Sequence, residues 1–570
     1  MIGYVCKYTP IDILESFGEK VIKIDPSISN FDNSDALMHP NMCFYSKSVL
    51  EYCLNNELNE IVLVNCCDSI RRLYDVLKTK KEFNFIHLID VPHKSSCCSV
   101  ELFKKELLRF IKHYEHYSGK IFNVNDFKNI LLNKISNGNN KPANTTSLNI
   151  AVLGARCKNS LIHIIENCNV KVAYNFTCTG NNITYSNFGE NEDLLTYYSQ
   201  NLLKSFPCLR MAALNKRYEV INENKKNITG IIYHTVKFCD FYSYEYTRLK
   251  NKIHLPMLKI ETDYTEQSEG QLQTRIEAFI ESLKVKQYTN NNLSTKYKRD
   301  INIIVDKYLD KKLVMGIDSG STSTNAVIMD ENKKIISYSI VRTSAKSSIG
   351  AENAFKEALR KANITKKDIS YIISTGYGRV SIPFANENVT EITCHAKGVH
   401  FLNERVRTII DIGGQDSKTI RLDANGNVID FAMNDKCAAG TGRFLEMMAR
   451  TLEISIDELG PLSLKWKENI NITSMCSVFA ESEVISLIAQ NKEKSDIIHG
   501  LCNSISSRTI SLIDRIKREG AFMITGGVAK NIGVVKALEK KLKEKIYIPE
   551  EPEIVGALGA AIISLEKFKL

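Results

Sequence analysis

Short apolar runs alternate with segments of helical periodicity through the first half of the chain. The run "EIVLVNCCD" (60–68) leads into the helical pattern "SIRRLYDVLKTK" and then into a second apolar run, "FIHLIDVP". The same alternation returns in "NIAVLG" (149–154), "NSLIHIIENC" and "KVAYNFTCTG". Strand-length apolar runs separated by helices are typical of parallel α/β sheets. We therefore predict two parallel α/β lobes in this half.

Two polar stretches interrupt this pattern and divide the chain. Residues 136–147, "SNGNNKPANTTS", have the composition of a loop, and residues 284–302, "KVKQYTNNNLSTKYKRDIN", lack any apolar period. These stretches predict a first domain, 1–285, with lobes of about 1–135 and 148–285. A linker, 286–311, and a second domain, 312–570, follow.

The second half contains an imperfect internal repeat. "VMGIDSGSTSTNAVIMD" and "TIIDIGGQDSKTIRLD" each read as a strand that ends in an aspartate, a glycine turn and a return strand, with Asp318 and Asp411 at equivalent places. Duplication of one supersecondary unit constrains the whole fold. It predicts two like lobes that face each other.

The two repeats and a third glycine turn carry groups that suit a nucleotide. A phosphate chain needs close backbone N–H groups, hydroxyls, and a carboxylate for Mg²⁺; "DSGSTSTN" and "DIGGQDSK" supply them, and "FMITGGVAKN" suits an adenosine. Each turn alone is more often an ordinary hairpin. No Walker A pattern is present, which disfavours a P-loop fold.

The order of the three turns resembles the actin, Hsp70 and sugar-kinase superfamily of ATPases, whose two ribonuclease-H-like lobes close on ATP. The resemblance implies that Asp318, Asp411 and Gln415 are catalytic: the two aspartates organise Mg²⁺ and water, and Gln415 faces the phosphates. It also implies a set of ATP- or ADP-binding residues: Gly316, Ser319, Gly320, Ser321, Thr322, Ser323, Gly413, Gly414, Asp416, Gly440, Gly526, Gly527 and Lys530.

Charge and cysteine content indicate which partners and which cellular compartment the protein suits. The formal charge of +10 comes from lysines interleaved with acids, which is the pattern of a solvated surface and argues against nucleic-acid binding. No export signal and no run of about 18 apolar residues are present, so we expect a cytoplasmic protein away from the membrane. Sixteen cysteines in a reducing compartment suit metals or catalysis better than disulfides.

Two of these cysteines precede helical patterns in the second half. Cys437 stands before "GRFLEMMARTL" and Cys476 before "AESEVISLIAQ". A helix N-terminus lowers a thiol pKa and favours an anionic ligand set. A cubane normally needs four thiolates, so a symmetric dimer in which each chain gives two would complete a 4Fe–4S cluster. The alternative is that both are ordinary buried or helix-start residues.

Residues 312–570 resemble the activators of 2-hydroxyacyl-CoA dehydratases, in the family that also holds the ATP-binding subunits of benzoyl-CoA reductase. "GIDSGSTSTN", "STGYGR", "EITCHAKG", "DIGGQDSK", "NDKCAAGTGRFLE", "CSVFAESEV", "TGGVAKN" and "PEIVGALGAA" carry the resemblance. It implies that Cys437 and Cys476 hold a 4Fe–4S cluster bridging a homodimer, that ATP hydrolysis drives a low-potential electron into a partner, and that a ferredoxin or flavodoxin is the donor. Cys394 and Cys502 are then structural.

The first half has a cysteine pattern of its own. Cys66, Cys67, Cys178 and Cys239 fall at or just past the carboxyl ends of predicted strands, the edge where parallel sheets place ligands. Cys43 and Cys208 are expected just before helical segments. The alternative is a set of buried thiols in an iron-free core.

This half resembles the iron–sulfur subunits of 2-hydroxyacyl-CoA dehydratases and the double-cubane cluster proteins. The matching stretches include "GYVCKYTPIDILESFG", "NCCDSIRRLYDVL", "LGARCKNSLI", "FTCTGN" and "HTVKFCDFYSYEY". The resemblance assigns an additional cluster to Cys43, Cys67 and Cys239, with Cys178 and Cys208 as ligands of a second cubane, and leaves Cys66 and Cys67 as alternatives.

The whole sequence therefore predicts a fused ATPase and iron–sulfur protein in which the second half delivers electrons to the first or to a separate dehydratase or cluster protein. Two other functions remain open. A small-molecule kinase of the same superfamily would need no cysteine at 437 or 476, and a nucleotide-gated interaction protein would leave the thiols inert or bound to zinc.

Overall fold

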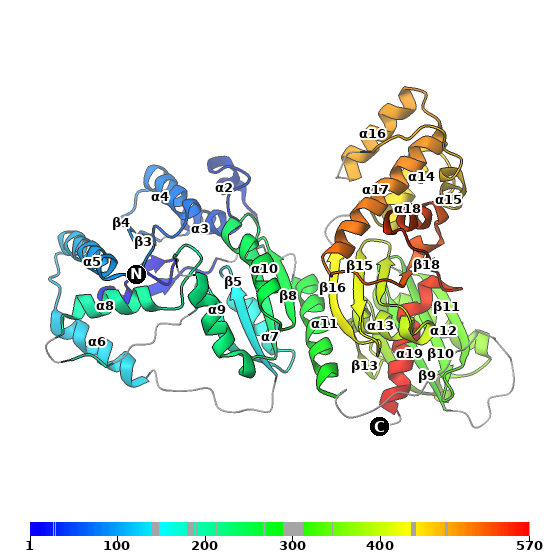
Figure 1. Ribbon diagram of the computed structural model, residues 1–570, viewed down its shortest axis with the longest axis horizontal. Helices are drawn as coiled ribbons and strands as arrows, with labels where there is room; N and C mark the ends of the chain where they lie inside the picture. The colour runs from blue at the N-terminus through cyan, green and yellow to red at the C-terminus, as the bar shows by residue number, and fades with distance from the viewer. Residues whose placement is uncertain are drawn as a thin grey trace. The chain divides into compact units, whose positions relative to one another are not determined.

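The structure is a computed structural model (Figure 1). It describes residues 1–26, 28, 30–56, 58–137, 148–178, 180, 187–189, 192–212, 214–265, 269–288, 312–344, 346–434, 440–472 and 477–568. The chain forms two compact units, Met1–Glu277 and Ala278–Leu570. The unit boundary falls inside helix α11 (Glu269–Tyr288), which extends into the predicted linker; the rest of that linker lies outside the described residues.

The first lobe of the N-terminal unit is a four-stranded parallel sheet of order β2-β1-β3-β4. Its strands are β1 (Ile2–Tyr4), β2 (Val21–Lys23), β3 (Glu60–Val64) and β4 (Phe85–Ile89). Its helices are α1 (Ile11–Ser16), α2 (Asp32–Leu37), α3 (Phe44–Asn55), α4 (Asp68–Lys80), α5 (Cys97–Ser118) and α6 (Val124–Asn137). The apolar residues of β3 are fully buried, as expected for a central parallel strand.

The second lobe repeats this architecture with the order β6-β5-β7-β8, again all parallel. Its strands are β5 (Asn149–Gly154), β6 (Lys171–Thr177), β7 (Gly230–Val236) and β8 (Met257–Thr262), and its helices are α7 (Asn159–Glu166), α8 (Leu194–Lys204), α9 (Leu214–Glu223) and α10 (Asp240–Lys252). One continuous hydrophobic core runs from Ile2 to Tyr264 and joins both lobes. The predicted two-lobed parallel α/β fold is confirmed.

The C-terminal unit contains two five-stranded sheets of the same design, of order β11-β10-β9-β12-β13 and β16-β15-β14-β17-β18. In each sheet the first three strands in sequence form an antiparallel meander, and the fourth runs parallel to the first of them. The strands are β9 (Leu313–Ser319), β10 (Ser323–Asp330), β11 (Ile335–Arg342), β12 (Ile369–Thr375), β13 (Glu387–Asn388), β14 (Thr408–Ile412), β15 (Ser417–Leu422), β16 (Val428–Asn434), β17 (Phe522–Thr525) and β18 (Ile546–Tyr547).

The internal repeat is thus a true structural duplication. Asp318 pairs with Asn325 on the neighbouring strand and Asp411 pairs with Lys418, so both aspartates lie next to the ends of equivalent strands. This topology confirms the duplicated ribonuclease-H-like fold of the actin and Hsp70 class.

The helices of this unit are α12 (Ser347–Ala362), α13 (Glu391–Leu402), α14 (Gly442–Thr451), α15 (Ile456–Ser463), α16 (Ser477–Ala489), α17 (Lys494–Asp514), α18 (Ile532–Leu542) and α19 (Val555–Phe568). In Figure 1, α16 and α17 are drawn in orange, and α19 is drawn in red beside the sheets. Helix α19 packs against β9, and a Cβ on Gly316 would lie 2.1 Å from the Ala557 carbonyl oxygen. Gly316 therefore permits helix–sheet contact. No helix in the described part of the chain is long and apolar enough to span a membrane.

Candidate functional site

A cleft of about 540 Å³ opens in the C-terminal unit and collects most of the predicted nucleotide-site residues. The predicted residues that line it are Asp318, Gly320, Ser321, Thr322, Ser323, Asp411, Gly413, Gly414, Asp416, Gly526, Gly527 and Lys530. Four predicted residues do not line it: Gly316 packs on α19, Ser319 is fully buried behind it, Gln415 is exposed, and Gly440 lies before α14.

The two predicted phosphate turns approach each other closely across this cleft. A Cβ on Gly414 would lie 1.8 Å from Thr322 Oγ1, so no larger residue fits there while Thr322 keeps its position. The absent side chain leaves backbone N–H groups accessible to a phosphate, as anion-binding turns require. The tertiary fold therefore joins two turns that lie far apart in the sequence.

Asp411 lies in a buried network that the sequence did not reveal. Lys418 Nζ lies 3.4 Å from an Asp411 oxygen and 2.5 Å from an Asp416 oxygen, while Thr525 donates to Asp411 at 2.9 Å. Burial alone would raise the pKa of Asp411, but His395, Lys418 and Thr525 lower it overall. Burial would likewise lower the pKa of Lys418, yet Asp416 and Asp411 hold it well above its usual value. Asp411 is therefore a carboxylate at neutral pH.

Asp318 has the opposite electrostatic character. A Cβ on Gly376 would lie 2.4 Å from one of its carboxylate oxygens and a Cβ on Gly556 would lie 2.2 Å from the other, so two glycines enclose it. Burial raises the pKa of Asp318 to about 6, while His395 counteracts the rise and Glu391 adds to it. Two equivalent aspartates of the repeat thus have pKa values displaced in opposite directions.

We predict that Asp318→Asn stabilises the nucleotide-free and Mg²⁺-free C-terminal unit at pH 8. The folded pKa of about 6 exceeds the ordinary value of 3.8, so the folded state carries the full penalty above pH 6 and loses it as the pH falls from 6 to below 3.8. The gain should be about 3 kcal/mol at pH 8 and less than about 1 kcal/mol at pH 4. Thermal unfolding at both pH values measures it; equal effects at pH 4 and pH 8 would contradict the assignment.

Glu391 is a further acidic residue of the cleft that sequence reasoning missed. It begins α13, is 3% exposed, and neither carboxylate oxygen has a hydrogen-bond partner among the described residues. Arg379 Nη1 lies 3.8 Å away. The preceding residue, Thr390, donates its N–H to Glu281 at 3.2 Å, which holds the start of the helix. A buried carboxylate without a direct partner is suited to hold a water molecule or a hydrated ion.

The acidic residues fit Mg²⁺ when a nucleotide shares the coordination. No three His, Cys, Asp or Glu side chains in the described ranges converge on a point where they could hold a single metal ion. Mg²⁺ is usually bound by one or two carboxylates together with substrate phosphates and water. Asp318 and Asp411 on opposite sheets are consistent with such a shared site.

The third glycine turn follows β17 and closes the other end of the cleft. Gly526 has φ of +80°, and a Cβ there would lie 2.4 Å from the Ile412 carbonyl oxygen, so only glycine fits without strain. Lys530 is paired with Glu553 at 2.7 Å and Glu551 at 3.0 Å. Its charge is therefore largely neutralised within the protein.

Helix α14 is tied to the second phosphate turn. Its first amides, Gly442 N–H and Arg443 N–H, each donate at 2.9 Å to the carbonyls of Gly413 and Gly414. These two N–H groups of the helix start are therefore already hydrogen-bonded within the protein. Thr451 at the end of α14 donates to Glu481 of α16 at 3.1 Å, which links the two helices.

Both cysteines predicted to bind the bridging cluster, Cys437 and Cys476, lie outside the described residues. Their positions in the chain are nevertheless clear: α16 begins at the residue after Cys476, and α14 begins shortly after Cys437. Cys394 and Cys502 are fully buried in α13 and α17 and do not line the cleft.

A second cavity, of about 90 Å³, lies in the N-terminal unit and is lined by thiols. Seven cysteines line it: Cys6, Cys43, Cys66, Cys67, Cys178, Cys208 and Cys239. The other lining side chains include Tyr45, Arg156 and Tyr242. The cavity is lined by every N-terminal cysteine that the sequence predicted as a ligand, including both alternatives, Cys66 and Cys67. Cys6 lines it as well, although it was not predicted.

The parallel sheets explain why these cysteines meet. Cys6 follows β1, Cys66 and Cys67 follow β3, Cys178 follows β6, and Cys239 follows β7. Carboxyl ends of parallel strands share one sheet edge, and the two lobes bring their edges together. Cys43 precedes α3 as expected. Cys208 differs from expectation, because it lies in a turn well before α9.

Two pairs of thiols in this cavity shift each other's pKa. The neighbouring Cys66 lowers the pKa of Cys6 and Cys239 lowers the pKa of Cys43, while the pKa values of Cys66 and Cys239 rise. Burial raises the pKa of Cys178 to about 12. One thiol of each pair is therefore prepared to become a thiolate.

The donor set of this cavity fits an iron–sulfur cluster. The cysteines of the described ranges are free thiols rather than disulfides, and thiolates are the usual ligands of such clusters. A cubane is larger than a single ion, so its ligands surround a volume instead of converging on one point. Cys6 could have been found from its place after the first strand; its partner Cys66 was already an alternative to Cys67.

The duplicated lobes and the acid-lined cleft define the C-terminal unit as a nucleotide-binding protein of the actin and Hsp70 fold class. The model of the BadF/BadG/BcrA/BcrD ATPase family matches residues 315–564, and the chain belongs to this family. The model of the 2-hydroxyglutaryl-CoA dehydratase D-component matches residues 6–141 and 124–283.

The chain is similar to two dehydratase activators and to one solved structure. The chain is 47% identical over 252 residues to the activator of lactoyl-CoA dehydratase from Anaerotignum propionicum, covering 44% of this chain and 97% of that protein. It is 40% identical over 255 residues to the 2-hydroxyisocaproyl-CoA dehydratase activator from Clostridioides difficile, covering 45% and 96%. The crystal structure of component A of (R)-2-hydroxyglutaryl-CoA dehydratase from Acidaminococcus fermentans shares 42% identity, covers 45% of this chain and 100% of that one, and has a TM-score of 0.44.

Proposed function

We propose that this protein uses ATP hydrolysis to drive low-potential electron transfer from a dimer-bridging 4Fe–4S cluster to an iron–sulfur acceptor of the dehydratase type. The C-terminal unit would supply the ATPase, and the thiol cavity of the N-terminal unit would hold the acceptor. The support is the membership in an ATPase family whose relatives are dehydratase activators, joined in one chain to a region that matches a dehydratase component.

The observation that carries the proposal is the hydrogen bonding of α14 to the second phosphate turn, Gly413–Gly414. The amides of Gly442 and Arg443 bind the carbonyls of Gly413 and Gly414, so a change of phosphate contacts at that turn displaces the start of α14. Cys437 shortly precedes this helix, and α16 after Cys476 is bonded to its far end. A change of nucleotide state would therefore be passed to helices α14 and α16, which follow the two cysteines in the sequence.

Within the cleft, the chain's own residues bind and orient the nucleotide. Ser321, Thr322 and the Gly413–Gly414 turn would contact phosphates, and Asp318 and Asp411 would position Mg²⁺ and the attacking water. Glu391, buried and without a direct partner in the described ranges, would hold that water. The phosphoryl group passes to water, so the products are ADP and phosphate.

A homodimer is the economical way to complete the bridging cluster, since two thiols from each chain supply four ligands across a two-fold axis. Helix α16, which begins after Cys476, exposes Phe479 at 68% and Ile485 at 54%. Exposed large apolar side chains on one helix are consistent with an interface at that place.

Iron–sulfur clusters would supply one-electron transfer at low potential in both units. In the N-terminal unit, Cys43, Cys67 and Cys239 would hold the acceptor cluster, and Cys178 and Cys208 would be ligands of a second cubane. Cys6 and Cys66 share their cavity. A ferredoxin or flavodoxin in the cytoplasm would reload the bridging cluster. The electron acceptor would be this cavity or that of a separate dehydratase.

Anaerobic purification of the full chain tests the proposal. We expect iron and acid-labile sulfide, ATP hydrolysis without a phosphorylated small molecule, and a loss of one cluster per dimer in Cys437→Ser. Cys98→Ser, at an exposed position outside the thiol cavity, should retain all iron. Iron-free protein, or a cluster spectrum unchanged in Cys437→Ser, would disprove the electron-transfer function; a phosphorylated product would favour a kinase.

A further inference from the structure

Three buried cations surround the thiol cavity, and only one of them is neutralised by a buried carboxylate. Arg217 forms a two-point salt bridge with Glu245, with distances of 2.6 and 3.0 Å, and both side chains are fully buried. Lys7 and Arg156 are also buried, at 8% and 2% exposure, but neither has such a partner. Asp25, which is partly exposed, lies 3.7 Å from Arg156 and compensates its charge only in part. Burial of an incompletely compensated charge is costly, so these two cations favour an anion in the cavity.

Arg156 lines the cavity and retains one unused donor. Its Nη1 donates to the Val5 carbonyl at 3.1 Å and its Nη2 to the Ile24 carbonyl, so the terminal nitrogens connect the two lobes. Its Nε is buried and has no hydrogen-bond partner among the described residues. The nearest carboxylate, Asp25, lies 3.7 Å from Nη2, beyond hydrogen-bonding distance, and is partly exposed. The guanidinium also lies over the Tyr45 ring, 4.7 Å from its centroid. These contacts leave Nε–H as the unused donor.

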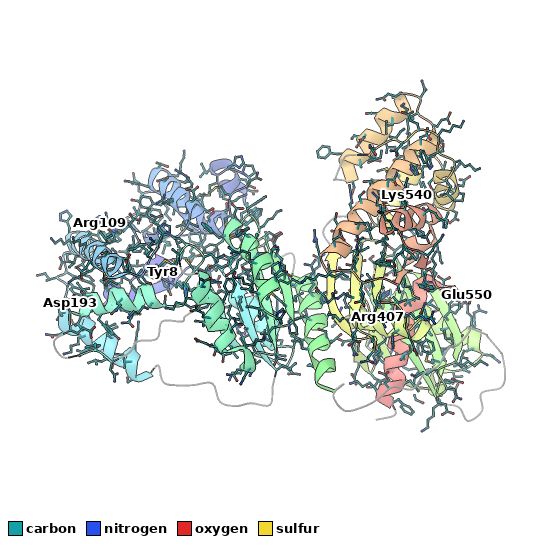
Figure 2. All side chains as sticks on the ribbon, in the orientation of Figure 1. Tyr8, Arg109, Asp193, Arg407, Lys540 and Glu550 are labelled. Atoms are coloured by element: carbon teal, nitrogen blue, oxygen red, sulfur yellow. The ribbon has the colours of Figure 1, made fainter. Side chains whose placement is uncertain are left out.

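Lys7 lies behind the same cavity, next to Cys6 in the sequence. Its Nζ donates to the Phe206 carbonyl, and the same turn is held by Tyr8, whose hydroxyl accepts from Cys208 N–H at 3.2 Å (Tyr8 is labelled in Figure 2). Cys208, Cys178 and Cys6 act favourably on the Lys7 charge, and all three line the cavity. The cavity thiols, in their thiolate form, are therefore able to compensate this charge.

We propose that Lys7 and Arg156 are positioning residues that compensate the negative charge of a metal–thiolate cluster in this cavity, and that Arg156 Nε–H donates to a sulfur of that cluster. This inference rests on the proposed function. Net charge and hydrogen bonds to sulfur set the reduction potential of iron–sulfur clusters. Both cations stabilise the more negative, reduced form, so they raise the potential and make the cavity a better electron acceptor.

The test is a reductive titration of the full chain, followed by electron paramagnetic resonance, in a Cys437→Ser background that lacks the bridging cluster. Arg156→Met and Lys7→Met should each lower the reduced-to-oxidised ratio at a fixed potential at least tenfold, which is about 59 mV for a one-electron couple. Arg156→Lys, which keeps the charge, should shift the potential less than Arg156→Met. Arg72→Met, which removes an exposed cation of the same unit, should leave it unchanged.

Thermal unfolding of metal-free and iron-loaded protein separates charge compensation from a merely structural role. We expect iron loading to raise the melting temperature less in Arg156→Met than in the parent chain. If Arg156→Met destabilises the metal-free and the iron-loaded protein equally, this inference alone is wrong. It is also wrong if Arg156→Met and Lys7→Met both keep full iron and an unchanged reduction potential. Absence of iron from the Cys437→Ser chain overturns it together with the proposed N-terminal acceptor.

Discussion

Replacing Asp411 by asparagine is expected to lower kcat for ATP hydrolysis by roughly 10²–10³-fold, which corresponds to about 3–4 kcal/mol of transition-state stabilisation. Asp411 is buried, receives a hydrogen bond from Thr525 at 2.9 Å and has a lowered pKa, so it is a fixed negative charge in the cleft. Asparagine has nearly the same shape but cannot neutralise Mg²⁺. It would also leave Lys418 with Asp416 as its remaining carboxylate partner.

Steady-state phosphate release, measured over a range of Mg²⁺ concentrations, checks this expectation. The matched control is Asp514→Asn on α17, where the carboxylate is 55% exposed and pairs with Arg518 on the surface. The control should retain parental kcat. A rate in Asp411→Asn within threefold of the parent, with the fold intact by circular dichroism, would remove Asp411 from the hydrolytic site.

Replacing Cys239 by serine is expected to remove most of the iron from the N-terminal unit. Cys239 follows β7 at the N-terminal boundary of α10, lines the cavity together with Cys43 and lowers the pKa of that thiol. A serine hydroxyl is a poor substitute for a thiolate toward iron. Loss of a ligand should weaken binding by more than the roughly 10–100-fold that loss of a ligand's outer hydrogen-bond partner costs.

Iron per chain, measured in the Cys437→Ser background, isolates this effect. The control is Cys168→Ser, because Cys168 lies just after α7, does not line the cavity and bonds to the Ile164 carbonyl. Full iron in Cys239→Ser would show that the acceptor cluster does not use this thiol. Equal iron loss in Cys168→Ser would indicate general unfolding instead.

Much of the fold was predictable because its signals are local. The strand β3 and the helix α4 follow directly from the periodicity of residues 60–80. The duplication was visible because Asp318 and Asp411 each precede a glycine turn and a return strand. Only the resemblance indicated that the three glycine turns form one nucleotide site. Nothing in the sequence of a single turn distinguishes a phosphate-binding turn from an ordinary hairpin.

Other features depend on contacts between distant segments. Glu391 gave no signal in the sequence, because its lack of a partner in the described ranges results from its burial between the sheets. Lys418 is one of many lysines until the fold places it between Asp411 and Asp416. Gly316 was expected at the nucleotide, yet helix α19 from the end of the chain occupies the space beside it.

The sequence by itself determined the parallel α/β lobes, the duplicated ATPase fold and the cysteines worth testing, because periodicity and residue spacing report local structure. The tertiary structure alone decided that Cys6 joins the thiol cavity, that Arg156 faces it with an unused donor, and that α14 is bonded to the phosphate turn. Each of these depends on the convergence of strand ends and turns from distant parts of the chain. Such convergence is set by packing across the whole unit and leaves no trace in any short segment.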